Sequence, residues 1–214
     1  AIGSGVGASP GYRDGIIKAV AIEFGLPVMG AKDLYEASWD MGDFVLYSGL
    51  LKRLAAKLSK IANDLRLLAS GPRGGLGELI LPARQAGSSL MPGKVNPVIP
   101  EALNQIAFRI FGLDTSITFA AESGQLQLNA FEPLIYSSIH EAVTLLTASI
   151  GMFRENCVEG LQANAAECRA KLDASVARAT EASETLGYDR AASITRHALH
   201  SGKSWAEALV DLNN

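Results

Sequence analysis

One short segment of the sequence, residues 87–97, gathers the residue types that a binding site for a small anion needs. Gly87 and Gly93 permit backbone conformations with positive φ, so that neighbouring amide N–H groups can converge on a negative charge. Lys94 supplies a compact positive charge, and the amide of Asn96 can donate to a second oxygen. The segment therefore predicts a loop that binds a carboxylate.

Two serines, Ser88 and Ser89, lie between these glycines. A serine beside amide donors and a lysine loses its proton more easily than a serine in water, because both neighbours favour the charged form. Ser88 could then act as a base rather than only as a nucleophile. Pro97 is expected to begin the next helix, whose positive dipole end would face the same anion. Composition alone leaves open the alternative of a surface loop without chemistry.

Helical periodicity dominates the chain on both sides of this loop, and no strand pattern is visible. Glycines and prolines separate the apolar-periodic stretches, which is typical of helix ends. Helices are expected at about residues 11–24, 34–70, from 97 or 100 to 115, 132–157 and 164–186, with two short ones within 187–212. Residues 71–87 are expected to form an ordered loop, and residues 117–128 fit either a helix or an extended chain.

The expected fold is all-α, with a bundle of long helices over residues 1–159 and a small helical domain over residues 160–214. Residues 44–51 and 99–111 are apolar on more than one helical face. Helices of that kind are buried on several sides, inside a large bundle or at an oligomer interface. A compact monomeric bundle is the alternative.

Composition excludes several classes of function. The 214 residues are 48% hydrophobic and 19% charged, with a net charge of −3 and no basic block, so neither nucleic acid nor a membrane is an expected partner. Cys157 and Cys168 are too few for a disulfide framework, and no histidine is spaced to join them around a metal. We expect reduced thiols, no metal and a cytoplasmic protein. The opening Ala1-Ile2-Gly3 indicates a segment of something longer, and no signal peptide is visible.

The order of residues in the loop resembles a known signature. Residues 87–97 match every fixed position of Gly-Ser-Ser-x-Met-Pro-x-Lys-x-Asn-Pro, which is similar to the signature loop of the aspartase/fumarase superfamily. Further stretches look like other parts of that family, at residues 36–40, 58–66, 70–78 and 187–192. The resemblance covers nearly the whole chain. It implies that residues 1–159 are the C-terminal part of a central helical-bundle domain and that residues 160–214 are a small C-terminal domain.

Residues 96–101 and 120–129 look more like the aspartase branch than the fumarase branch. That branch implies a lyase that removes ammonia from L-aspartate and leaves fumarate, through an aci-carboxylate intermediate that positive charge and fixed donors stabilise. A class II-type fumarate hydratase or a related succinyl-compound lyase stays open, because residues 182–184 replace the family's Leu-Asn-Pro. A truncated, catalytically incomplete helical assembly fragment is an alternative of another class.

The resemblance also implies roles for individual residues. Ser88 would be the catalytic base, and the substrate would be bound by Ser89, Lys94 and Asn96. Glu101 matches a supporting position that pairs with a histidine from another segment. Neither a cofactor nor a metal is implied.

Sites in this family are composite, because three separated regions meet from different subunits of a homotetramer. This chain has only the third region, so the resemblance implies an N-terminal half of the same protein and a chain that is inactive by itself. His140, His197 and His200 match neither of the other regions and are expected to be surface or packing residues. The implied ligand is a small dicarboxylate.

Overall fold

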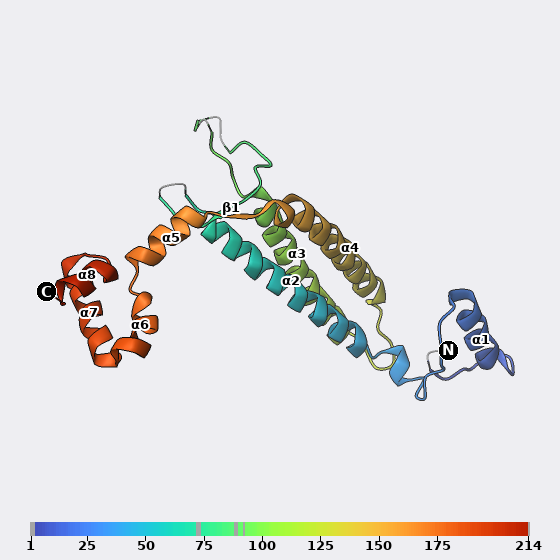
Figure 1. Ribbon diagram of the computed structural model, residues 1–214. Coiled ribbons are helices and arrows are strands. Elements are labelled where there is room, and N and C mark those ends of the chain that lie inside the picture. The colour runs from blue at the N-terminus through green and yellow to red at the C-terminus, as the bar shows by residue number, and fades with distance from the viewer. Residues whose placement is uncertain (1–2, 72–73, 88–89, 92, 214) are drawn as a thin grey trace. The chain divides into compact units, whose positions relative to one another are not determined.

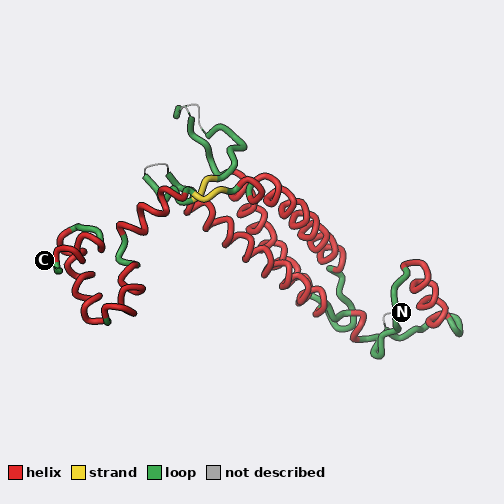
Figure 2. Tube along the Cα trace, viewed as in Figure 1, coloured by secondary structure: helices red, strands yellow, loops and turns green. Residues whose placement is uncertain are grey.

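The computed structural model describes residues 3–71, 74–87, 90–91 and 93–213. Within them most of the chain is helical (Figure 1), and long helices account for most of the regular structure (Figure 2). The prediction of an all-α fold is confirmed. The chain divides into two compact units, one of residues 1–62 and 101–152 and the other of residues 63–100 and 153–214. The expected domain boundary near residue 160 stays a prediction.

A bundle of three long helices forms the body of the first unit (Figure 1). The helices are α2 (Gly42–Leu68), α3 (Val98–Glu122) and α4 (Glu132–Asn156). Their apolar residues recur at helical spacing and meet in the interior, where burial contributes about 25 cal/mol per Å². One core cluster contains Ala55, Ala107, Ile110, Leu113, Ala142 and Leu146, and a second contains Met41, Ile117, Ala120 and Ile135.

Polar side chains inside this bundle are paired across helices. The hydroxyl of Ser48 donates to Oδ1 of Asp114 at 2.8 Å, and Nζ of Lys52 lies 2.9 Å from Oδ2 of the same carboxylate. Nδ2 of Asn104 donates to the carbonyl oxygen and the hydroxyl of Ser59 at 3.0 and 2.9 Å. Because buried polar groups are costly unless they are hydrogen-bonded, these pairs fix how α2 and α3 align.

The beginning of the long helix expected at residues 34–70 is predicted wrongly. A separate 3₁₀ turn, η1 (Glu36–Ser38), precedes α2, which begins at Gly42. Asp33 accepts backbone hydrogen bonds from within that turn, and Oδ1 of Asp40 accepts the N–H of Gly42 at 2.8 Å. Aspartate side chains of this kind compete with the helical hydrogen-bond pattern, and they delay the start of the helix.

Helices α1 and α3 end in different ways. Helix α1 (Tyr12–Phe24) ends as predicted at Gly25, which takes the left-handed conformation. Helix α3 continues past the expected end at Thr115, which settles the undecided stretch as helical as far as Glu122. The amide of Asn129 donates to the last carbonyl groups of α3, at Ala120 and Ala121.

Four shorter helices follow in the second unit: α5 (Ala165–Ala174), α6 (Arg178–Leu186), α7 (Tyr188–Ser201) and α8 (Trp205–Asp211). The single helix expected at 164–186 is wrong, because the chain breaks between α5 and α6. There the hydroxyl of Ser175 accepts the N–H of Ala177 at 3.2 Å in place of a helical carbonyl. The two short helices expected within 187–212 are confirmed as α7 and α8.

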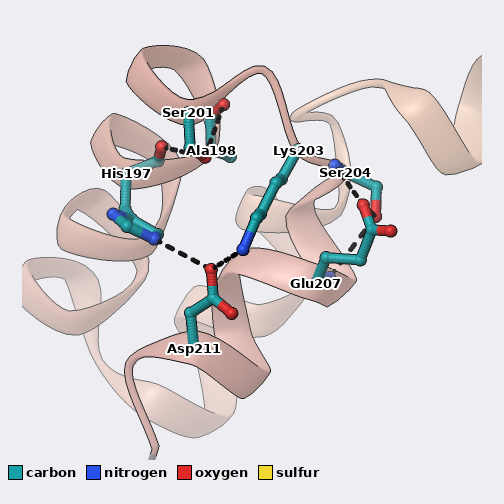
Figure 3. A network of polar contacts seen from close by, with 7 residues as sticks. All are labelled: His197, Ala198, Ser201, Lys203, Ser204, Glu207 and Asp211. Carbon is teal, nitrogen blue, oxygen red and sulfur yellow. Dashed lines mark hydrogen bonds and ion pairs between the residues drawn. The ribbon is translucent and has the colours of Figure 1, made fainter.

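The helices α7 and α8 share a small apolar core and a polar edge. Ile194, Ala198, Trp205 and Ala208 are buried together. Figure 3 shows the polar edge, where Lys203 and His197 both contact Oδ2 of Asp211, at 2.6 and 3.2 Å. Hydrogen bonding from Lys203, and then from His197, lowers the pKa of Asp211, and the carboxylate in turn raises the pKa of Lys203. This contact joins the end of α8 to α7.

The two cysteines are free thiols, as predicted. Cys157 is buried, and desolvation raises the pKa of its thiol, which makes it a poor nucleophile. Cys168 is half-buried on α5. Among the described residues, no helix is long and apolar enough to span a membrane, and no three acidic, histidine or cysteine side chains are grouped to hold a metal.

Candidate active site

The segment that carries the predicted chemistry is a hairpin closed by a narrow neck. The N–H of Gly87 donates to the carbonyl oxygen of Lys94 at 2.6 Å, and Ala86 and Val95 form an antiparallel bridge. Nδ2 of Asn96 donates to the carbonyl oxygen of Gly87 at 3.3 Å and so closes the neck from the other side. The neck therefore fixes the backbone position of Lys94 and the side-chain position of Asn96.

The two serines to which catalysis and substrate binding were assigned, Ser88 and Ser89, lie outside the described residues. Their roles stay predictions.

The glycines of the hairpin are needed for two different reasons. Gly93 has a φ of 82°, the left-handed conformation that glycine permits. Gly87 does not have a positive φ. A Cβ atom at Gly87 would lie 2.7 Å from Cγ of Lys94 and 2.9 Å from its carbonyl oxygen, so the close approach of the two chains requires glycine there.

Beside the hairpin lies a cavity of about 960 Å³ within the second unit. Residues 91 and 93–97 line it, together with residues from the segment 77–83 and from the end of α2. Lys94 and Arg66 both line it, and none of its described lining residues is an aspartate or a glutamate. The charged groups on its wall are therefore cations, which favours an anionic ligand.

Hydrogen bonds hold residues 76–78, at the start of the lining segment 77–83. The N–H of Gly77 donates to the carbonyl oxygen of Ser70 at 2.6 Å. Asn164, which caps α5, donates its amide to the carbonyl oxygen of Gly77 at 2.9 Å and its N–H to that of Glu78 at 2.8 Å. Lys171 of α5 donates to the carbonyl oxygen of Leu76 and lies 3.6 Å from Oε1 of Glu78.

A two-stranded β-ladder extends the contact between the segments 77–80 and 162–164. Strand β1 (Leu79–Ile80) pairs antiparallel with β2 (Gln162–Ala163), Leu79 standing opposite Ala163. The sequence shows no sign of it, because two residues are too few for an alternating pattern. The ladder and the cap at Asn164 hold the wall in place independently of any ligand.

The predicted site residues divide between the two units. Lys94 and Asn96 line one cavity in the second unit, Lys94 with an exposed side chain and Asn96 with a half-buried one. Glu101 lies in the first turn of α3, in the first unit, and is half-buried. Its acidic side chain suits the positive end of the helix. Its supporting role stays a prediction.

Two lining residues, Arg66 and Asn164, were missed by reasoning from the sequence. Arg66 is the basic residue in the last turn of α2, and its local spacing gives no signal that it lines the cavity. Asn164 could have been found as a helix cap.

The three histidines take no part in the cavity. His140 is exposed and stacks on Tyr136 with ring centroids 6.2 Å apart, and His200 is exposed near the end of α7. His197 is half-buried and contacts Asp211. Their predicted surface or packing positions are confirmed.

Comparison with known proteins gives a consistent set of relatives. Residues 1–112 match a family described as lyases. The chain is 53% identical over 207 residues to an aspartate ammonia-lyase of Pseudomonas canavaninivorans, covering 97% of this chain and 44% of that protein. To the aspartate ammonia-lyase of Corynebacterium glutamicum it is 47% identical over 211 residues, covering 99% of this chain and 40% of that protein.

Two solved structures share the fold over the full chain. A fumarate lyase:delta crystallin of Brucella melitensis, bound to cobalt, has a TM-score of 0.93 at 50% identity, with 46% of that chain covered. A class II fumarase of Schistosoma mansoni has a TM-score of 0.90 at 32% identity, with 48% of that chain covered. The chain thus spans less than half the length of the proteins it matches.

Proposed function

The chain belongs to the lyase family, within the aspartase/fumarase superfamily, and we propose from this that the complete protein eliminates ammonia from L-aspartate to give fumarate. One observation carries the proposal: Lys94 and Asn96 of the signature hairpin line a cavity whose described charged groups are all cations. The likeness to two aspartate ammonia-lyases, at 53% and 47% identity, favours aspartate as the substrate.

The proposed mechanism assigns the difficult step to Ser88. The deprotonated serine removes a proton from the carbon next to one carboxylate, and the electron pair moves into that carboxylate to form a doubly charged aci-carboxylate. The pair then returns to form the carbon–carbon double bond while ammonia leaves from the neighbouring carbon. Lys94 and Asn96 hold the carboxylate on which the charge develops, so they bind the intermediate more strongly than the substrate.

A homotetramer with composite sites is part of the same proposal. Support comes from large apolar side chains on the bundle helices that this chain leaves exposed, among them Phe119 at 67% and Tyr136 at 71%. Large apolar side chains exposed on neighbouring helices are normally covered by another protein surface. Light scattering of the complete protein should give a tetramer, and a stable monomer at micromolar concentration would contradict the assembly.

The experiment that tests the reaction uses the complete protein and two substrates. With L-aspartate, we expect ultraviolet absorbance from fumarate to rise together with released ammonia. With fumarate and no ammonia, we expect no malate. The second candidate is a fumarate hydratase, favoured by the structural likeness to the class II fumarase. Malate formed from fumarate, with aspartate left unchanged, would select that candidate.

Two further alternatives are distinguished by the same assay. A related succinyl-compound lyase would leave both aspartate and fumarate unchanged. A purely structural helical module is not favoured, since the matched relatives named above are called lyases or a fumarase. We expect the 214-residue chain by itself to be inactive, because the proposed site needs residues from other segments.

A further inference from the structure

We propose that Asn164 is a positioning residue of the site, because it fastens the cavity-lining segment 77–83 to the start of α5 and the affinity for dicarboxylates depends on that attachment. The inference rests on the proposed function for the class of ligand. It concerns one part of a site whose other parts are proposed to come from segments outside this chain. The observation behind it is that Asn164 lines the cavity and bonds to residues 77 and 78.

The polar groups of Asn164 are engaged within the protein. Nδ2 donates to the carbonyl oxygen of Gly77 at 2.9 Å, and Oδ1 accepts the N–H of Glu167 at 3.4 Å. The backbone N–H of Asn164 donates to the carbonyl oxygen of Glu78 at 2.8 Å. Because these bonds occupy both ends of the amide group, we assign Asn164 to positioning rather than to direct binding of the ligand.

The bond to Gly77 acts at the turn where the chain enters the lining segment. Gly77 has a φ of 60°, and its N–H donates to the carbonyl oxygen of Ser70 at 2.6 Å. Residues 79–83 follow this turn and also line the cavity. A turn held from both sides fixes the direction in which these residues leave it, so loss of the amide of Asn164 should let this part of the lining shift.

A second side chain of α5 holds the same part of the chain. Nζ of Lys171 donates to the carbonyl oxygen of Leu76 and lies 3.6 Å from Oε1 of Glu78. Lys171 follows Asn164 at an i, i+7 spacing, which places both on one face of the helix. Lys171 is not among the described residues that line the cavity, so its replacement tests the attachment without altering the lining itself.

An asparagine at this place also has an ordinary structural use, because its oxygen caps the first turn of a helix. The capping role needs only Oδ1, whereas the proposed role needs the N–H groups of Nδ2. Asn164→Ser separates the two roles, since a serine hydroxyl caps a helix about as well as asparagine does but carries no amide to donate to Gly77.

The test uses the complete protein and measures succinate affinity by calorimetry together with KM and kcat for aspartate. Asn164→Ser should weaken succinate binding and raise KM by about 2- to 10-fold, the range that the loss of one ordinary hydrogen bond corresponds to. The value of kcat should change little, because the proposed base and carboxylate-binding residues remain. Backbone hydrogen exchange in the segment 76–83 should become faster. Lys171→Met should change affinity and exchange in the same direction.

Two controls match these substitutions. Ser204→Ala removes the cap of α8, and Ser204 does not line the cavity, so the unfolding temperature should fall while succinate affinity stays unchanged. Arg169→Met removes a positive charge from α5, as Lys171→Met does, but Arg169 is exposed and pairs with Asp173 of the same helix. Its replacement should also leave succinate affinity unchanged.

Unchanged succinate affinity in folded Asn164→Ser would overturn the inference, and so would an equal loss in Ser204→Ala. If Asn164→Ser does not fold, Lys171→Met decides, and an affinity equal to that of Arg169→Met overturns the inference. Aspartate turnover separates the two proposals. A protein that binds succinate but never consumes aspartate would end the proposed reaction, and weaker succinate binding by Asn164→Ser would then still support the positioning role. Normal turnover with unchanged affinity in Asn164→Ser would do the reverse.

Discussion

The helical bundle and the hairpin beside the cavity are held in shape by different forces. In the bundle, side chains such as Ile110 and Ile135 are 1% exposed, and buried apolar surface holds the helices together. Most of the described side chains in the hairpin are exposed, and the neck depends on backbone hydrogen bonds such as that from Gly87 to Lys94. A change in the bundle should therefore alter stability first, and a change in the hairpin should alter ligand binding and rate first.

The largest effect should come from the hairpin. In the complete protein, Ser88→Ala should lower the rate of elimination by about 10²–10⁴-fold, the usual contribution of a general base. Succinate affinity should change little, because the carboxylate-binding groups remain. The unfolding temperature should also stay unchanged. Steady-state kinetics, calorimetry and thermal unfolding together check these outcomes.

Two neighbouring substitutions serve as controls for Ser88. Ser89→Ala should cost less, since Ser89 is assigned to binding rather than to proton transfer. Lys94→Ala should weaken binding as well as rate, because its charge acts on both the substrate and the intermediate. Equal rate losses for Ser88→Ala and Ser89→Ala would remove the case for Ser88 as the base.

The bundle should respond in the opposite way. Ile110→Ala leaves a cavity in the core and should lower the free energy of unfolding by about 2–5 kcal/mol, while Ile110→Val should cost only about 0.5–1.5 kcal/mol. The protein that remains folded should keep the wild-type KM. Denaturant unfolding followed by circular dichroism measures the first quantity. A changed KM at unchanged stability would contradict the division between bundle and hairpin.

A smaller effect is expected at the neck of the hairpin. Gly87→Ala places a Cβ 2.9 Å from the carbonyl oxygen of Lys94, and relief of that overlap should cost about 1–3 kcal/mol and shift the hairpin. KM should rise because Lys94 is displaced. Gly93→Asn is the control, since asparagine tolerates a left-handed backbone at little cost. If both variants kept the wild-type KM, the neck would not be what positions Lys94.

Helices were predictable where apolar spacing was long and the ends were marked. The helix expected at 132–157 is found as Glu132–Asn156, and the one expected at 11–24 as Tyr12–Phe24. In both cases burial or a glycine cap reinforces the local preference. The pattern failed where one polar side chain redirected the backbone, as at Asp40 before α2 and at Ser175 before α6.

The sequence predicts only those site residues that lie within one continuous segment. Lys94 and Asn96 stand in one motif, so their shared position on the cavity follows from local spacing. Arg66 reaches the same cavity from the end of another element, and no spacing within the sequence records that approach. The hydrogen bond from Asn96 to Gly87 was missed for a related reason, because it needs the closed neck.

The smallest expected effect lies in the polar edge between α7 and α8, whose charges are exposed and screened by water. Lys203, and then His197, hold the pKa of Asp211 below its ordinary value of 3.8. Because the folded protein binds that proton less readily than the unfolded chain, the contribution of Asp211 is complete above pH 3.8. It is lost as the pH falls further, through the lowered pKa. The Asp211 carboxylate also raises the pKa of Lys203 above 10.5, so the same contact weakens in alkali as the pH rises through that raised value.

Asp211→Asn removes the contribution of this carboxylate to stability, in acid and in alkali alike. The two proteins can therefore be compared by their unfolding temperatures across the pH range. Fluorescence of the buried Trp205 reports unfolding of this small core. The unfolding temperature of Asp211→Asn should lie below that of the unsubstituted protein between these two limits, and the gap should narrow in acid below pH 3.8 and in alkali above pH 10.5. A gap that stays constant across the pH range would show that Asp211 acts through packing and not through its charge.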